Sequence, residues 1–342
     1  MAKNRPLTYL MNTSVMKKLG IAFIGSGDIA NLHAEAINEL ADAELIGLWN
    51  RTAEKGIAKA EQFGCKFFWN VEELLADPKV DAVFVLTNME THCQYTVQSA
   101  QAGKHVLVEK PAASSLEELA QMQDAVDKAG IKCMPVHNYI YEPGIERAKA
   151  MIDSGKLGVI TQFYMMYNIH HADEIRARYP GVIRQILTHH SYTMLYLAGQ
   201  PKTVSCFQHT VDTTIAPQEN VAMANIQMQS GTLSHLCASF ANDDHAGDPW
   251  SCIIKVIGTK GSARYSYRDF VINDRNGAHS QTYQCYPESI KNTAAHFIQR
   301  VVGAGEAPYS SLQDAITCQH ILEACEQSVK DGVHVDLTSK LV

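Results

Sequence analysis

The spacing of apolar and polar residues differs between the first and second halves of the chain. In the first half, short apolar runs alternate with segments that carry an apolar stripe at helical spacing. Strands are expected at 19–24, 44–49, 81–86, 105–108 and 131–136, and helices at 28–40, 52–63, 90–102 and 115–128. Strands separated by helices of this length predict a doubly wound parallel sheet.

The second half predicts a different architecture. Helices are expected at 143–153, 182–197 and 312–329, and strands with two-residue alternation at 203–211, 220–229, 232–240, 251–257 and 262–267. Short connections between these strands favour antiparallel pairing. We therefore expect a tail over 1–16, an α/β domain over 17–137, and an α+β domain with a mostly antiparallel sheet over 138–342.

Composition narrows the function classes. The 342 residues suffice for two domains, and 46% hydrophobic residues with 19% charged residues allow both to bury a core. A net charge of -7 makes nucleic acid a poor partner, because that binding depends on Lys and Arg. No apolar run of about 18 residues is present, so no membrane span is expected. The N-terminal tail lacks the apolar segment of a secretion signal.

Cysteine and histidine usage points away from disulfides and metals. The nine cysteines are scattered and form no C-x-x-C pair, which favours reduced thiols in a cytoplasmic protein. His170-His171 and His189-His190 suggest a metal at first sight. Adjacent residues of a strand point to opposite faces, however, and no third ligand has a characteristic spacing. We expect no metal site.

A glycine-rich loop follows the first expected strand and opens the first expected helix. Its pattern is G-x-G-x-x-A, with Gly25 allowing a tight turn and Gly27 letting the backbone approach a pyrophosphate. Ser26, Asp28 and Ile29 place further groups where the helix N-terminus attracts an anion. The loop therefore predicts a Rossmann domain that binds a nicotinamide dinucleotide.

The end of the second strand bears on the choice of dinucleotide. NAD sites usually carry Asp or Glu there, whereas this chain has Asn50, Arg51 and Thr52. Asn50 does not repel a 2′-phosphate, Arg51 can pair with one, and Thr52 can donate to one. The alternative is that Arg51 is simply solvated. The pattern favours NADP(H) over NAD(H).

Lys110 stands at the end of the fifth strand, in Glu109-Lys110-Pro111. Ligands of open α/β sheets bind at the carboxyl ends of the strands, so this amine can hydrogen-bond a reacting oxygen. Desolvation or a cationic nicotinamide ring would help it to lose its proton. The alternative is a surface lysine before a proline that begins a helix.

Several motifs of the chain resemble those of a known family. GSGDIA, the TNMETH stretch, AGKHVLVEKP, the IDSGKLG turn and the VIGTKG turn match the glucose–fructose oxidoreductase / inositol 2-dehydrogenase / rhizopine-catabolism (Gfo/Idh/MocA) family, over about residues 19 to 337. The resemblance implies a second domain with a large open, mostly antiparallel sheet. It implies an NAD(P)-dependent oxidoreductase that transfers a hydride between nicotinamide and a secondary alcohol or ketone of a sugar, cyclitol or related polyol, acting as a homodimer or homotetramer.

The resemblance also assigns residues and leaves two other functions open. It places Lys110 in catalysis, and it places Thr87, Asn88, His92, Glu109 and Lys110 in the cofactor site. A nucleotide-sensing regulator without turnover and a redox-assisted glycosidase both occur in the family and remain alternatives.

The expected helix 182–197 carries a second group of polar residues. Gln185, His189 and Tyr192 lie at i, i+4 and i+7 and should share one face. Many members of the resembled family carry Asp, His and Asp there, so His189 matches the catalytic histidine while Gln185 and Tyr192 depart. With an ordinary pKa of about 6.5, His189 is suited to acid/base work. The alternatives are a structural histidine and a register error with His190.

Other residues are expected to face the substrate. Gln185 can hydrogen-bond a hydroxyl in place of the missing carboxylate, and Tyr192 can offer its own hydroxyl. Tyr139, with Tyr141 and Glu142, follows the last Rossmann strand and is expected to line the cleft between domains. Residues 242–245 are expected to form a polar loop, over the substrate mouth in one interpretation.

Overall fold

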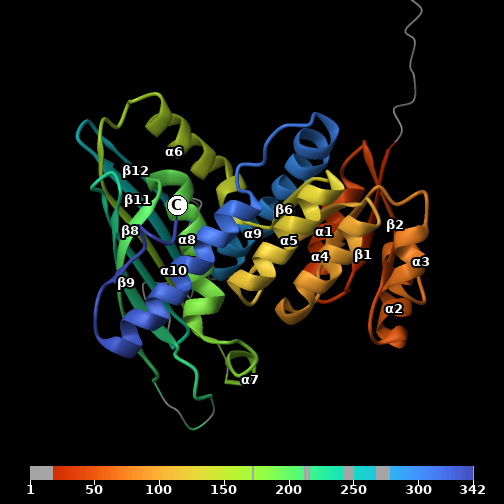
Figure 1. The fold of residues 1–342 in the computed structure, drawn as a ribbon, viewed down its shortest axis with the longest axis horizontal. Helices are drawn as coiled ribbons and strands as arrows, with labels where there is room; N and C mark the ends of the chain where they lie inside the picture. The colour runs from red at the N-terminus through yellow and green to blue at the C-terminus, as the bar shows by residue number, and fades with distance from the viewer. Residues whose placement is uncertain are drawn as a thin grey trace, which may run out of the picture.

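A computed structural model describes residues 18–171, 173–211, 214, 216–241, 250–266 and 278–341. Two sheets lie side by side, the first built from the N-terminal third of the chain and the second from the remainder (Figure 1). The expected tail and the expected loop at 242–245 fall outside the described residues. Among the helices that are described, none has the length and apolar character needed to cross a membrane.

The first sheet has the order β3-β2-β1-β4-β5-β6 and every described pair in it is parallel. The strand order reverses between β1 and β4, so the loops after these two strands border the crevice where such sheets bind ligands. This confirms the Rossmann fold. The strands are β1 (Leu19–Ile24), β2 (Ala43–Trp49), β3 (Lys66–Phe67), β4 (Ala82–Val85), β5 (His105–Val108) and β6 (Cys133–Pro135).

Helices cover both faces of this sheet. The side chain of Ser115 caps α5 by accepting the N–H of Glu118 at 3.2 Å, as the sequence predicts. The short helix α3 and the two-residue strand β3 were not expected. The helices are α1 (Ile29–Asn38), α2 (Ala53–Phe63), α3 (Val71–Ala76), η1 (Met89–Thr91), α4 (His92–Gln101) and α5 (Leu116–Ala129).

The second sheet has the order β12-β11-β7-β10-β9-β8-β13. Its described pairs are antiparallel except β7 with β10, so the expectation of a large, mostly antiparallel sheet is confirmed. The interior strand β7, which pairs with β11 and β10, was not expected. Its strands are β7 (Ile160–Ile169), β8 (Pro201–His209), β9 (Val221–Met228), β10 (Leu233–Ser239), β11 (Trp250–Gly258), β12 (Ser262–Ser266) and β13 (Val335–Asp336).

The helices of the second half occupy both domains. Helix α8 packs against β7 and β10, whereas α9 packs against α1 of the Rossmann domain (Figure 1). In η4, the ring of Phe297 meets Phe84 of β4 edge-on, with 5.9 Å between centroids. The boundary near 137 therefore separates the two sheets, but not the helices. They are η2 (Asn138–Tyr141), α6 (Pro143–Asp153), α7 (Asp173–Arg176), η3 (Ile183–Leu187), α8 (Thr188–Ala198), α9 (Ala278–Ala295), η4 (His296–Gly303) and α10 (Leu312–Asp331).

Candidate active site

The glycine loop after β1 has the geometry that an anion site needs. Gly25 has φ +99°, and a Cβ there would lie 2.7 Å from the carbonyl oxygen of Leu86. A Cβ on Gly27 would meet nothing within 4 Å, so open space lies in front of the loop. The hydroxyl of Ser26 is buried and has no hydrogen-bond partner among the described residues. With the N-terminus of α1 alongside, these features fit a dinucleotide pyrophosphate.

The end of β2 is tied to the same loop. The Ser26 N–H donates to Oδ1 of Asn50 at 3.3 Å, and Nδ2 of Asn50 donates to the Thr52 carbonyl at 2.9 Å. Arg51 is exposed. It borders a pocket of about 350 Å³, which Asn50 and Tyr95 also line. Asn50 therefore holds the loop in place, and Arg51 has room to meet a ligand.

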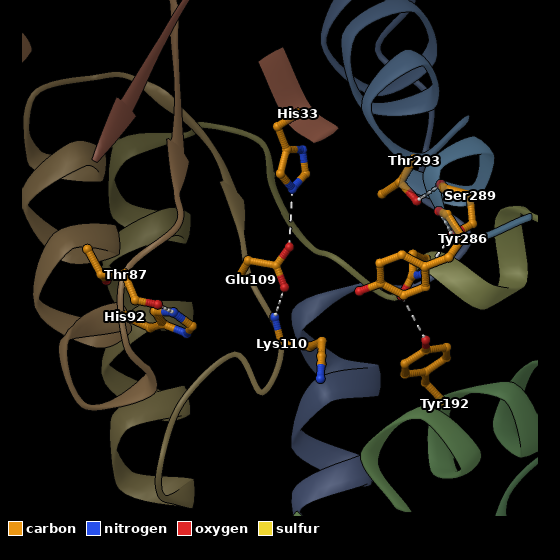
Figure 2. A network of polar contacts seen from close by, with 10 residues as sticks. His33, Thr87, His92, Glu109, Lys110, Tyr192, Tyr286, Ser289 and Thr293 are labelled. Atoms are coloured by element: carbon orange, nitrogen blue, oxygen red, sulfur yellow. Dashed lines mark hydrogen bonds and ion pairs between the residues drawn. The ribbon is translucent and has the colours of Figure 1, made fainter. Parts of the chain in front are cut away.

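The loop after β4 contains Thr87, Asn88 and His92. Both ring nitrogens of His92 lie 2.9 Å from carbonyl oxygens, one of Thr87 and one of Pro111. Figure 2 shows His92 lying beside Thr87. His92 thus joins this loop to the segment after Lys110, and its ring is engaged by the backbone. Thr87 and Asn88 are partly or fully exposed and can face a cofactor.

Lys110 follows Glu109 just after β5, and the Glu109 carboxylate contacts a buried histidine. Its N–H donates to Oε2 of Glu109 at 3.0 Å, and Oε1 of Glu109 lies 3.1 Å from Nε2 of His33 (Figure 2). Burial lowers the pKa of Lys110 to about 8, while the Glu109 carboxylate opposes that shift. The lysine therefore titrates close to neutral pH, as proton transfer requires.

His189 lies in α8, against the residues that follow β6. Its ring stacks on Tyr139 with 4.4 Å between centroids, and its Nδ1 lies 2.5 Å from the Tyr192 hydroxyl. Burial, helped by the charge of Lys110, lowers the pKa of His189 well below its ordinary value. The imidazole is therefore neutral at pH 7, and its acid/base role stays a prediction. No described hydrogen bond uses its Nε2.

The neighbouring histidine has a different environment. His190 is fully buried, and neither of its ring nitrogens has a hydrogen-bond partner among the described residues. Burial lowers the pKa of His190 to about 3, with His235 of β10 as the next contribution. His190 therefore faces the second sheet, and His189 is the histidine near Lys110.

Tyr192 is enclosed by hydrogen bonds. Besides His189, its hydroxyl contacts Oδ1 of Asn138 at 3.3 Å and accepts the N–H of Tyr139 at 3.3 Å. The amide of Asn138 in turn donates to the Ser289 hydroxyl at 2.7 Å. Figure 2 shows Tyr192 and Ser289, which lie at the two ends of this link through Asn138. Tyr192 was expected to offer its hydroxyl to a substrate; its contacts make it a support for His189.

Gln185 does not share a regular helical face with His189. The residues of η3 form a π-helical segment, which interrupts the 3.6-residue spacing assumed from the sequence. Gln185 is partly exposed, and within the described part of the chain no hydrogen bond joins its side chain to His189 or Tyr192. Its side chain remains available to another group.

Tyr141 and Glu142 were expected to line the cleft, whereas Tyr286 was not singled out from the sequence. The Tyr141 hydroxyl contacts the Met134 sulfur at 3.3 Å, and Glu142 accepts the Tyr265 hydroxyl at 2.9 Å. Both are as buried as Tyr139 and support packing through these contacts, and their place at the cleft stays a prediction. Tyr286, which the sequence did not single out because α9 was not predicted, extends from α9 toward Glu109 and Lys110 (Figure 2).

No metal centre emerges from the part of the chain that the structure describes, where no three His, Cys, Asp or Glu side chains converge.

Comparison with known proteins identifies the family. Residues 19–137 match the model of an oxidoreductase family with an NAD-binding Rossmann fold, and residues 145–264 match the GFO/IDH/MocA C-terminal domain. The chain belongs to the Gfo/Idh/MocA family of oxidoreductases. It is an NAD(P)-dependent oxidoreductase, as its resemblance to that family implied.

Related proteins and solved structures support this assignment to the family. The chain is 30% identical over 227 residues to 1,5-anhydro-D-fructose reductase of Ensifer adhaerens, covering 64% of this chain and 68% of the relative. It is 24% identical to D-apiose dehydrogenase of Paraburkholderia graminis, covering 96% and 92%. A levoglucosan dehydrogenase in complex with NADH and levoglucosan superimposes with TM-score 0.82 at 21% identity, covering 94% and 100%. These relatives are named as reductases and dehydrogenases, and none supports a regulator or a glycosidase.

Proposed function

We propose that this member of the Gfo/Idh/MocA family interconverts a secondary alcohol and a ketone on a sugar, cyclitol or related polyol. The observation that carries the proposal is the position of Lys110 at the carboxyl end of β5, in the sheet that carries the glycine loop, and near enough to His189 of α8 for its charge to act on that ring. The named substrates of relatives, among them 1,5-anhydro-D-fructose and myo-inositol, support a polyhydroxylated ring.

The bound nicotinamide supplies or accepts the hydride. Lys110 and His189 deal with the proton at the reacting oxygen. Lys110 has the pKa that suits proton transfer near neutral pH, so its ammonium protonates the oxygen in reduction and its amine accepts the proton in oxidation. His189 is the second candidate for this role. With Nδ1 engaged by Tyr192, it presents Nε2 to the oxygen or to a neighbouring hydroxyl.

The aromatic side chains of the site suit a sugar-like substrate. Tyr139 holds the His189 ring by stacking, and Tyr286 reaches toward Lys110 from α9 (Figure 2). Gln185 is partly exposed and can donate to and accept from substrate hydroxyls. We propose that these residues orient the substrate, while Thr87 and Asn88 contact the cofactor.

We propose that NADP(H) is preferred over NAD(H). Arg51 is exposed at the rim of the pocket after β2, and the position is not occupied by a carboxylate that would repel a 2′-phosphate. Comparing the Kd values for NADPH and NADH in the wild type and in Arg51→Ala tests this. The variant should weaken NADPH binding and leave NADH binding unchanged, and a wild-type preference for NADH contradicts the proposal.

The outer face of the second sheet supports a homodimer or homotetramer. Exposed apolar side chains gather on it: Tyr164, Met166, Phe207, Met223 and Leu233, with Phe207 73% exposed. A cytoplasmic location is proposed because the eight described cysteines are free thiols. Light scattering of the wild type and of Phe207→Asp measures subunit number, which should fall in the variant.

One experiment tests the central proposal. Purified protein is offered a panel of sugars, cyclitols, other polyols and keto-sugars with NADP(H) and NAD(H), and nicotinamide absorbance is followed. Turnover on at least one polyol or keto-sugar is expected, and kcat should fall roughly 100-fold or more in Lys110→Met. Absence of turnover across the panel, in protein that binds dinucleotide, contradicts the proposal.

A further inference from the structure

A buried histidine connects the helix of the glycine loop to the residue before Lys110. His33 lies in α1 and is 0% exposed. Its Nε2 is 3.1 Å from Oε1 of Glu109, and Oε2 of the same carboxylate accepts the N–H of Lys110 at 3.0 Å (Figure 2). One carboxylate therefore joins α1 to the backbone of Lys110.

The surroundings of His33 show that packing alone does not account for it. The ring lies edge-on to Phe23 and Phe84, with centroids 6.5 and 5.4 Å away. Its Nδ1 is buried with no partner among the described residues. An apolar side chain would fill this place without an unpaired nitrogen, whose burial is unfavourable. The histidine is thus accounted for by its contact with Glu109.

The tautomer follows from the same contacts. A carboxylate oxygen only accepts hydrogen bonds, so Nε2 of His33 must carry a proton to pair with Oε1 of Glu109. A neutral ring with its proton on Nε2 leaves only a lone pair of Nδ1 unsatisfied. His33 is therefore a fixed donor to the carboxylate.

We infer that His33 is a positioning residue that acts on Lys110 through Glu109. This inference rests on the proposed function, in which Lys110 carries the proton. The Glu109 carboxylate favours the protonated form of Lys110 and opposes the effect of burial. By donating to Oε1, His33 holds this carboxylate in place and keeps Oε2 directed at the backbone of Lys110.

The other groups around Lys110 do not replace Glu109. Burial lowers the pKa of His137 to about 3 and that of His189 well below its ordinary value, so both are uncharged at pH 7. Burial raises the pKa of Tyr192 well above its ordinary value, so it is uncharged as well. Figure 2 shows His33 from α1, Glu109 after β5, Tyr192 from α8 and Tyr286 from α9 around Lys110. His137 after β6 and His189 from α8 are near enough for the charge of Lys110 to lower their pKa values.

The test measures the titration of Lys110 in the full-length protein. The rate at which acetic anhydride acylates Lys110 is followed against pH by peptide mass spectrometry, and the pH profile of oxidation is recorded in parallel. Glu109→Gln removes the charge and should lower the pKa of Lys110 by about one unit or more. His33→Leu should lower it in the same direction, because the carboxylate loses the contact that holds it beside Lys110.

His33→Gln is the rescue variant, because its amide nitrogen can donate to the same oxygen. It should return the titration of Lys110 to that of the wild type. His105→Leu, the same substitution near the opposite end of β5, is the matched control and should leave Lys110 unchanged. If His33→Leu does not fold, His33→Asn replaces it, since its shorter amide does not reach Oε1.

The outcomes separate this inference from the proposed function. Identical titration of Lys110 in the wild type, His33→Leu and Glu109→Gln overturns it. A shift in His33→Gln as large as that in His33→Leu indicates a packing role and overturns it too. Acylation requires no turnover, so a protein inactive on every polyol would refute the proposed function, while the labelling still decides the role of His33.

Discussion

Oxidation and reduction should depend on pH in opposite directions around pH 8. If Lys110 carries the proton, oxidation requires the free amine and reduction requires the ammonium ion. For a group with a pKa of about 8, the free amine makes up about 9% at pH 7 and about 91% at pH 9. With dinucleotide saturating, kcat/KM for the polyol should therefore rise about tenfold over this interval, and kcat/KM for the ketone should fall about tenfold.

A role for His189 as the proton carrier predicts something else. Burial lowers the pKa of His189 well below 6.5, so its free form is already fully populated at pH 7. Oxidation would then be independent of pH between 7 and 9. A flat profile for oxidation in this range would falsify the assignment to Lys110 and favour His189.

Substitution provides the second part of this test. Lys110→Met keeps most of the side-chain volume and should lower kcat roughly 100-fold or more, the usual contribution of a positioned proton donor, with little change in dinucleotide Kd. The pH dependence should disappear with it. Lys132→Met, which removes an exposed lysine beyond the other end of β5, is the control and should keep the wild-type profile.

Further substitutions test other parts of the structure. Gly25→Ala should lower Tm, because its Cβ would overlap the backbone, whereas Gly27→Ala should keep the wild-type Tm and weaken dinucleotide binding; equal effects in calorimetry and titration would contradict this. The folded protein keeps the Glu142 proton up to a pKa of about 8 and the unfolded chain loses it near 4.5, so stability declines as pH rises between these values. Glu142→Gln should remove this decline and stabilise by up to about 3 kcal/mol at pH 7, measured by urea unfolding, and no gain would refute the buried-carboxyl account. Tyr192→Phe should lower kcat on the order of tenfold by releasing Nδ1 of His189, at unchanged dinucleotide Kd; full activity would show that this hydrogen bond is dispensable.

The Rossmann half was predictable because its signals are local. Each strand is a short apolar run, and the six residues of the glycine loop predict both a tight turn and a dinucleotide ligand. The second half of the chain was less predictable from its sequence. In β7, side chains of the outer face such as Tyr164 and Met166 are themselves apolar, which hides the two-residue alternation of a strand.

The candidate site shows the same limit. Lys110 was predicted from a short motif and His189 from its match to a helix of the resembled family, but their pKa values depend on burial by distant segments. The π-helical segment η3 interrupts the regular helical spacing between Gln185 and His189, and the sequence spacing does not predict such a segment. His33 and Tyr286 became visible only when α1 and α9 were placed against the end of β5 (Figure 2).

The return of α9 and η4 to the first sheet bears on how the protein can be recombined. A chimera joined at the boundary near residue 137 would cover α1 and Phe84 with a foreign helix, since α9 and Phe297 come from the far half of the chain. Grafting a new substrate domain therefore calls for transplanting residues 278–303 together with the nucleotide half. This packing of α9 and η4 on the first sheet ties the halves at a second place besides the linker, which disfavours wide hinge opening.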